Sequence, residues 1–286
     1  MRPALGSRPI RGGSRYHEPV HDFDPHTPSI ARVYDYFLGG KDNFSADREV
    51  AERQIAIAPL IPVIALENRR FLARAVTWVA NQGVGQFIDL GCGLPTVPNT
   101  HESARVAVPE ARVAYVDNDP VVLSHLDALV AKGNPGVTVV AGDVREVTAT
   151  FDGVRADIDL SAPVCLIMGY LLHFFAPEAA RKLVADYLTR LAPGSYVVLS
   201  AIHADSEAAD EGFGGYSSAV ASVYNHSVPD FAGFFGPLDL VPPGVVDART
   251  WQPAWEEPVS LPKREGYVLA GVARVAQPMG KPAGSR

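Results

Sequence analysis

Two glycines and two acidic residues at the ends of apolar runs are the strongest chemical signal in this sequence. Asp89 lies near the end of the run 86–90 and is followed by Gly91 and Gly93. Glycine permits a sharp turn and lets a ligand approach the backbone closely, because no Cβ stands in the way. Asp117 ends the next apolar run, and one carboxylate can accept hydrogen bonds from both vicinal hydroxyls of a ribose. The pattern predicts a turn beneath a nucleoside-type cofactor.

Further polar residues at strand ends extend this predicted site. Asn118 follows Asp117 directly, and Asp143 with Val144 ends the third apolar run, where an acid can meet an adenine amino group. Each acid also has a simpler explanation, as a helix cap for Asp117 and as a solvated surface residue for Asp143. Asp119 already fits the cap of the next helix, which leaves Asp117 for the ligand.

The glycine turn alone would also fit an ordinary strand-to-helix connection or a nicotinamide dinucleotide site. Pro95 stands where a dinucleotide fingerprint would have a third glycine, and Asp143 also argues against a nicotinamide cofactor. The sequence contains no nucleophile elbow of the Gly-x-Ser-x-Gly type and no phosphate loop ending in Gly-Lys-Ser/Thr. The only cysteines are Cys92 and Cys165, and no Cys/His spacing suggests zinc, so neither a disulfide framework nor a metal site is expected.

The composition sets broad limits on the protein's partners. The chain has 286 residues, is 47% hydrophobic and carries a formal net charge of −7, which argues against a dedicated nucleic-acid binder. No apolar run has the length that spans a bilayer, and the N-terminus lacks the apolar core of a signal peptide. We expect a cytoplasmic protein without nucleic-acid or membrane partners, and leave homo-oligomerisation open.

Apolar runs alternate with helical segments from residue 86 onward, and this alternation predicts an α/β fold with a parallel sheet. Strands are predicted at 86–90, 112–116, 137–141, 163–168, 195–201, 244–247 and 266–275, and helices at about 100–107, 120–132, 177–191 and 205–224. The last strand is expected to close the sheet in an antiparallel direction. The stretch 231–244 is expected to be an irregular connection.

The chain is predicted to contain four parts. Residues in the first part show no periodicity, and those in the second form three helices before the first strand. The parts are a disordered arm (1–26), an N-terminal helical cap (27–82), the cofactor-binding core (83–276) and a flexible tail (277–286).

The cap contains residues that could face a ligand. The turn at 39–44 carries Lys41 and Asn43 beside two glycines without an evident structural need, and polar loops on a rigid scaffold often carry function. We therefore predict that the cap covers the cofactor and that Lys41 or Asn43 contacts the cofactor or the substrate. Tyr34, on the preceding helix, is predicted at the substrate pocket, although core packing explains a helical aromatic residue equally well.

Three more candidates follow the fourth and fifth strands, at the edge where such a fold binds its substrate. Tyr170 and His203 are predicted to line the substrate pocket, and His173 could act as a general base. A purely packing role for His173 is the slightly favoured alternative. Aromatic residues between Phe213 and Phe235 could form a wall of the pocket, which ordinary burial explains equally well.

The motifs Asp-Leu-Gly-Cys-Gly, Tyr-Val-Asp-Asn-Asp-Pro and Ala-Gly-Asp-Val, in this order, resemble the cofactor motifs of class I S-adenosylmethionine-dependent methyltransferases. More narrowly, residues 31–49 resemble an actinobacterial family of S-adenosyl methyltransferases long catalogued as a domain of unknown function. Residues 93–102 and 171–175 fit that family as well. The resemblance covers about residues 26–275. It implies a Rossmann-like class I fold with a seven-stranded, mostly parallel sheet, helices on both faces and the N-terminal helical cap, and S-adenosylmethionine across the strand ends.

The function that this resemblance implies is methyl transfer from S-adenosylmethionine to a small-molecule acceptor. Such an in-line displacement mainly needs orientation and a dry site, so no catalytic triad is expected. Two alternatives stay open, namely a non-catalytic module that binds S-adenosylmethionine or regulates, and a less favoured NAD(P)-dependent oxidoreductase.

Overall fold

Five parallel strands form the centre of a mixed sheet whose order is β3-β2-β1-β4-β5-β8-β6, with β7 also paired to β8. The computed structural model describes residues 24–204, 220–252 and 267–276. The strands are β1 (Gln86–Leu90), β2 (Arg112–Asp117), β3 (Val137–Ala141), β4 (Cys165–Met168), β5 (Tyr196–His203), β6 (Asp239–Leu240), β7 (Val246–Asp247) and β8 (Tyr267–Arg274). As predicted, β8 runs antiparallel to β5. The sheet has eight strands instead of seven, because β6 and β7, of two residues each, both pair with β8.

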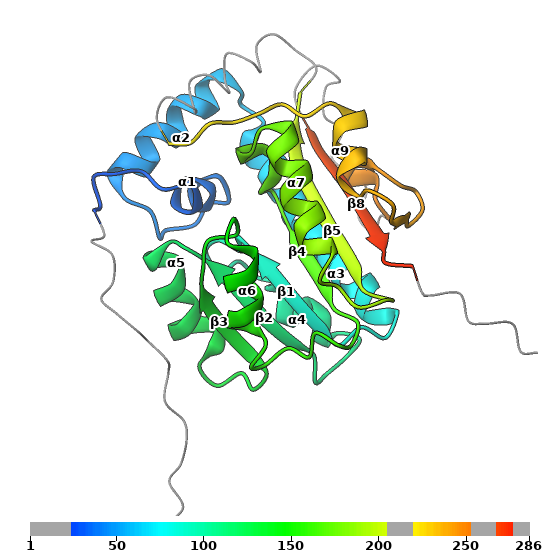
Figure 1. Ribbon diagram of the computed structural model, residues 1–286. Helices are drawn as coiled ribbons and strands as arrows, with labels where there is room; N and C mark the ends of the chain where they lie inside the picture. Colours follow the sequence, from blue (N-terminus) through cyan, green and yellow to red (C-terminus); the bar gives the residue numbers. More distant parts are fainter. Residues whose placement is uncertain (1–23, 205–219, 253–266, 277–286) are drawn as a thin grey trace, which may run out of the picture.

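Helices cover both faces of this sheet (Figure 1). Side chains alternate along each buried strand, so Phe87 packs in a core cluster with α3 while its neighbour Ile88 packs in a cluster with α6 and α7. The first cluster also holds residues of α4 and α5, and the second holds residues of α9. These helices are α3 (Ile61–Asn81), α4 (Thr100–Arg105), α5 (Pro120–His125), α6 (Val147–Val154), α7 (Pro177–Leu188) and α9 (Val228–Phe234). The α/β class and the helices on both faces are thereby confirmed.

The starts of α4 and α5 agree with the helices predicted from about residues 100 and 120. The Asp119 carboxylate accepts a hydrogen bond from the Val121 amide at 2.8 Å, and Pro120 occupies the first turn of α5. Glu102 accepts a hydrogen bond from the Asn99 amide at 2.6 Å and so caps α4. The helix after Asp119 was predicted through residue 132, and it continues beyond α5 as a π-helical turn at Leu126–Ala131.

Two remaining helices, α1 (Ile30–Phe37) and α2 (Ser45–Ile57), precede α3 and lie beside the sheet rather than on either face (Figure 1). The predicted cap of three helices over 27–82 needs correction, because the third helix, α3, packs on the sheet as part of the core and only α1 and α2 lie apart from it. None of the helices in the described parts of the chain combines the length and the apolar character that crossing a bilayer requires.

Other predictions for the regular structure need correction. The sequence predicted no helix where α6 lies, and it predicted an irregular connection over 231–244, although α9 extends to Phe234. The predicted helix at 205–224 falls largely on 205–219, outside the described residues, and 221–227 have no regular structure. The predicted disordered arm and flexible tail also fall almost wholly outside the described residues.

Candidate active site

A cavity of about 640 Å³ lies at the carboxyl ends of β2, β1, β4 and β5. Residues of the segment 24–37, which we call the roof, also line it. These four strands are neighbours in that order. At about 4.8 Å between neighbouring strands, the floor of the cavity extends for roughly 14 Å. The volume falls in the range of pockets that hold drug-sized molecules, about 300 to 1,000 Å³.

The glycine turn after β1 forms one end of the cavity. Gly91 and Gly93 line it with φ angles of +61° and +69°, which residues with a side chain rarely adopt. A Cβ on Gly93 would meet no protein atom within 4 Å, so it would occupy open space beside the turn. A ligand can therefore approach the backbone here, as the sequence predicted for this turn.

Asp117, at the end of β2, holds the glycine turn and faces the cavity. One carboxylate oxygen accepts a hydrogen bond from the Gly93 amide at 2.9 Å, and the other accepts from the Asp119 amide at 3.0 Å. The side chain lines the cavity while the residue is only 7% exposed. Burial raises the pKa of this carboxyl above its usual range, and the backbone hydrogen bonds oppose the shift. Asn118 lines the cavity as well and is exposed.

Asp89 lies behind the turn rather than in the main cavity. It lines a small adjoining pocket and accepts a 2.5 Å hydrogen bond from the Thr100 hydroxyl. Burial raises the pKa of Asp89 to about 6, against the lowering effects of the Thr100 hydrogen bond and the nearby Arg69 charge. The observed contact of Asp89 is thus with Thr100, the first residue of α4, and not with the main cavity.

Arg69 is the functional candidate that the sequence analysis missed. It projects from α3, lines both pockets and donates a hydrogen bond to the Thr96 carbonyl oxygen at 3.1 Å. A guanidinium at this place suits a ligand carboxylate. The only sequence signal was a pair of arginines in an apolar helix, which gives no indication of the loop that the helix faces.

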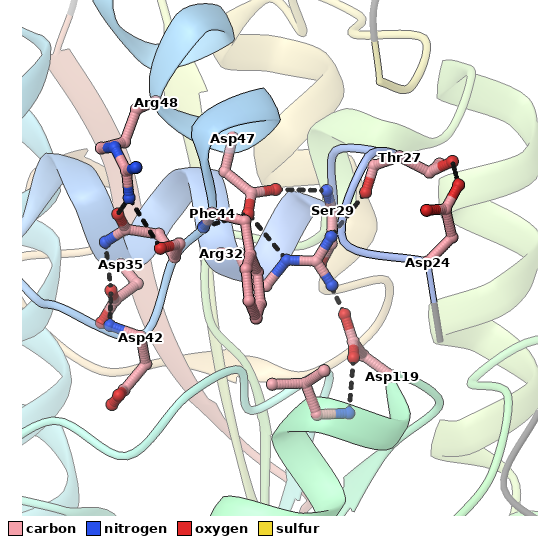
Figure 2. A network of polar contacts seen from close by, with 12 residues as sticks. Asp24, Thr27, Ser29, Arg32, Asp35, Asp42, Phe44, Asp47, Arg48 and Asp119 are labelled. Atoms are coloured by element: carbon pink, nitrogen blue, oxygen red, sulfur yellow. Dashed lines mark hydrogen bonds and ion pairs between the residues drawn. The ribbon is translucent and has the colours of Figure 1, made fainter. Parts of the chain in front are cut away.

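The roof of the cavity is tied to the floor by a network of polar contacts (Figure 2). The Ser29 hydroxyl donates to Asp119 at 2.5 Å, and the Ser29 amide donates to Asp47 at 2.9 Å. Asp47, which is fully buried, also pairs with Arg32 at 2.8 Å and accepts from the Phe44 amide. Asp47 therefore joins the start of α1 to the start of α2, and Ser29 joins both to the core.

The opposite end of the cavity, over β4 and β5, is aromatic and apolar. Tyr34 of the roof packs on Tyr170 with ring centroids 5.1 Å apart, and Tyr170 packs on His173 at 4.6 Å. Phe174, Ile202 and other apolar side chains complete this end. The two ends thus differ in character, with carboxylates and glycines over β2 and β1 and rings over β4 and β5.

Comparison with known proteins agrees with this architecture. A family model described as S-adenosyl methyltransferase matches residues 16–276. The chain belongs to this S-adenosyl methyltransferase family. It is an S-adenosylmethionine-dependent methyltransferase, and its cofactor is S-adenosylmethionine.

Two solved structures support the same assignment for the methyltransferase. A proposed methyltransferase from Thermobifida fusca YX is 38% identical with a TM-score of 0.83, over 88% of this chain and 96% of that one. A DUF574 family protein from Streptomyces avermitilis MA-4680 is 32% identical with a TM-score of 0.82, over 88% of this chain and 98% of that one. No curated protein matches this chain.

The residues present fit this cofactor. A buried carboxylate at Asp117 suits a ribose diol, and the open space beside Gly93 admits a ligand close to the backbone. Arg69 provides a cation near the same turn for the carboxylate of the methionine part. One cavity thus contains the Asp117 carboxylate, the backbone at Gly93 and the Arg69 cation, which suit the ribose and the charged amino-acid part of this cofactor.

The structure places several predicted cofactor contacts of the methyltransferase outside this cavity. Asn43 donates hydrogen bonds to the Asp35 carboxylate at 2.9 Å and to the Gly40 carbonyl oxygen at 3.1 Å, and Lys41 is exposed. A Cβ on Gly40 would lie 1.9 Å from the Asp35 carboxylate. The polar turn therefore has a structural role that the sequence did not reveal, because it donates hydrogen bonds to the buried Asp35 carboxylate near the end of α1.

Asp143 and Val144 also do not line the cavity. Asp143 pairs with Arg145, whose side-chain hydrogen bond lowers the pKa of this carboxyl. The Asp143 side chain is half-buried and lies outside the cavity, so the adenine contact stays a prediction.

His203 is buried at the end of β5 and does not line the cavity. Its Nδ1 is 2.7 Å from the carbonyl oxygen of His226, and its ring packs on Tyr267. Of the aromatic residues proposed as a wall, Phe231, Phe234 and Phe235 are buried in the core, Tyr224 is partly exposed, and Phe213 and Tyr216 lie outside the described residues. The observed wall is instead formed by residues of the cap and of the segment after β4.

His173 lines the cavity but is poorly suited to act as a base. Burial lowers its pKa to about 3, so the imidazole stays neutral and weakly basic at neutral pH. The backbone amide of Ile202 donates to its Nδ1 at 3.5 Å. These contacts favour the packing interpretation of His173.

The pKa of His173 predicts an acid-dependent stability that is measurable by substitution. The unfolded chain takes up a proton below the reference pKa of 6.5, whereas the folded histidine does so only near 3, so stability is present above pH 6.5 and falls as the pH drops. Between pH 7 and pH 5, His173→Asn should lose about 2 kcal/mol less unfolding free energy than the wild type. Urea titrations at both pH values measure the difference, and equal losses in the two proteins would refute it.

Proposed function

We propose that this methyltransferase transfers the methyl group to a small molecule held over β4 and β5, and that it works in the cytoplasm. The observation that carries the proposal is that one cavity is lined both by Asp117 and Gly93 at one end and by Tyr34 and Tyr170 at the other. Residues of the segment 24–37 line this cavity, and its volume of about 640 Å³ has to hold the cofactor together with the acceptor, which favours a small acceptor.

In this proposal the protein itself orients the cofactor and the acceptor and excludes water from the cavity. In the proposed arrangement Asp117 holds the ribose, the turn at Gly91 and Gly93 lies against the methionine part, and Arg69 pairs with its carboxylate. When bound, the cofactor supplies an electrophilic methyl group on a positively charged sulfur. The roof excludes water and the aromatic end orients the acceptor, so that proximity and desolvation account for the rate. His173, which stays neutral, shapes the wall rather than removing a proton.

The role of Arg69 gives a direct test of this arrangement. Arg69→Gln should weaken S-adenosylhomocysteine binding by about 10- to 100-fold, since a hydrogen bond to a charged group contributes about 1.5–3 kcal/mol. Binding of 5′-methylthioadenosine, which lacks the carboxylate, should change less than about two-fold on the same reasoning. Isothermal titration calorimetry with both ligands measures the two affinities.

Arg70→Lys is the matched control, because Arg70 is the next residue of α3 and does not line the cavity, and lysine keeps the positive charge beside its buried partner Glu67. It should leave both affinities unchanged. Equal weakening of both ligands by Arg69→Gln, or of neither, would contradict the proposed orientation of the cofactor.

A further inference from the structure

The aromatic end of the cavity is a continuous wall rather than a set of scattered rings. We use the name aromatic wall for Tyr34, Tyr170, His173 and Phe174, which all line the cavity. Successive ring centroids are 5.1, 4.6 and 4.2 Å apart along this series. The rings are tilted or edge-on to one another, with interplanar angles of 37°, 70° and 47°, so the wall presents both ring faces and ring edges, and an aromatic ligand can pack against either.

Tyr170, at the centre of the wall, is held in an unusual backbone conformation. Its φ is +56°, in the left-handed region that a residue with a side chain enters at a cost of about 1–2 kcal/mol. The Tyr170 amide donates to the Ser200 hydroxyl at 2.9 Å and to the Ser200 carbonyl oxygen at 3.0 Å. The strain and its fixation at a cavity wall indicate that the direction of this ring matters for function.

A buried chain of hydrogen bonds connects Tyr170 to the roof. The Ser200 hydroxyl donates to Asn68 Oδ1 at 2.7 Å, Asn68 Nδ2 donates to the Tyr34 hydroxyl at 3.0 Å, and Tyr34 donates to the Ala65 carbonyl oxygen at 3.0 Å. The chain thus runs from β5 through α3 to α1. Because the Tyr34 hydroxyl both accepts and donates within this chain, Tyr34 offers a ligand mainly the face and edge of its ring.

The charged groups that line the cavity lie elsewhere among the described residues. Asp117 and Asp119 follow β2, and Arg69 reaches toward the turn after β1. Arg32 and Asp24 belong to the roof, where Arg32 pairs with Asp47. Arg69 is the one of these charges that acts on the wall, since burial raises the pKa of Tyr34 and the Arg69 charge lowers it, but in the proposed function Arg69 pairs with the cofactor carboxylate. A charged acceptor would therefore lose water at the aromatic wall without gaining a further counter-charge from these residues.

We propose that the methyl acceptor is a flat, uncharged ring compound that packs against the aromatic wall, and that Asn68 and Ser200 are positioning residues that hold the wall in place. The inference rests on the proposed function for its claim that the bound ring receives a methyl group. Ring binding itself can be measured on the whole protein with and without S-adenosylhomocysteine.

The test uses three probes of similar size at pH 7.5, namely indole, cyclohexanol and benzoate, titrated against the labelled protein by NMR. Indole is flat and uncharged, cyclohexanol is not flat and benzoate is charged. Indole should bind about two- to ten-fold more tightly than cyclohexanol, since an aromatic pair contributes about 0.5–1.5 kcal/mol beyond its buried area. It should also bind more tightly than benzoate, because the benzoate charge would lose water at the wall. Equal binding of the three probes would overturn the proposal.

Variants separate the wall from the cofactor end. Tyr170→Leu should weaken indole binding at least about five-fold and leave the S-adenosylhomocysteine affinity unchanged. Asn68→Ala and Ser200→Ala should also weaken indole binding. Ser200→Thr, which keeps the hydroxyl, should bind indole as the wild type does. Tyr224→Leu is the matched control, since this ring is 38% exposed and does not line the cavity. Parallel loss of both ligands in Asn68→Ala would indicate general structural damage and overturn the positioning role.

The two proposals fail in different ways. If indole binds at the wall but S-adenosylhomocysteine does not bind at all, the proposed function is wrong and the ring site stands. If S-adenosylhomocysteine binds and indole binds no better to the wild type than to Tyr170→Leu, the ring site is wrong and the proposed function stands.

Discussion

Asp117→Asn is expected to weaken S-adenosylhomocysteine binding by about 100-fold. Two ribose hydroxyls donating to one buried carboxylate contribute about 1.5 kcal/mol each, and asparagine offers only one acceptor oxygen with no charge. The Gly93 amide also loses part of its partner, because the Asp117 carboxylate accepts from it at 2.9 Å. Calorimetric titration of the wild type and the variant measures the loss.

The effect should be one of affinity rather than of folding. Burial raises the pKa of Asp117, which means that its negative charge reduces the free energy of unfolding of the unliganded protein. A neutral asparagine does not carry this desolvation cost. Asp186→Asn is the control, since Asp186 is on α7, is well exposed and pairs with Lys182 outside the cavity. An affinity unchanged within about three-fold in Asp117→Asn, a difference below 1 kcal/mol, would remove Asp117 from the cofactor site.

Asp47→Ala is expected to open the roof of the cavity. Asp47 is fully buried and accepts from the amides of Ser29 and Phe44 as well as from Arg32. Removing one partner of a buried ion pair costs about 3–5 kcal/mol, because the remaining charge loses its compensation. Amide hydrogen exchange in α1 and α2 should therefore accelerate by at least about 100-fold, while exchange in β1 and β4 changes far less.

Two comparisons show whether the charge pair causes this effect. The double variant Arg32→Met with Asp47→Leu should be less destabilised than Asp47→Ala, because it leaves no buried charge. Asp186→Ala, which breaks the exposed pair with Lys182, should change stability by no more than about 1 kcal/mol. Exchange that accelerates equally in the cap and in the central strands would show that the cap is not a separate unit of stability.

The sequence predicted the core of the fold because its signals are local. Apolar alternation places Phe87 and Ile88 on opposite faces of one strand, and Asp119 caps a helix only two residues away. The glycine turn and Asp117 were predictable for the same reason, since each lies at the end of an apolar run. The cavity brings them together because neighbouring parallel strands end at one edge of the sheet.

The sequence could not predict contacts between distant segments. Asn68 meets Ser200 across 132 positions of the chain, and Arg69 faces a loop 27 residues away, which no periodicity reveals. The misinterpretation of Lys41 and Asn43 has the same origin, because the buried partner of the turn, Asp35, reads as an ordinary exposed residue of a helix. The resemblance to a known family indicated the cofactor, whereas the proposed acceptor wall came from the geometry alone.

The most direct test of the account is calorimetric titration of the intact protein with S-adenosylhomocysteine and, separately, with NAD. The carboxylate of Asp117, the open turn at Gly93 and the cation of Arg69 line one cavity, so S-adenosylhomocysteine should bind at a single site. NAD should not bind, because Pro95 replaces the third glycine of a dinucleotide loop. Tight binding of NAD together with no binding of S-adenosylhomocysteine would contradict the central claim.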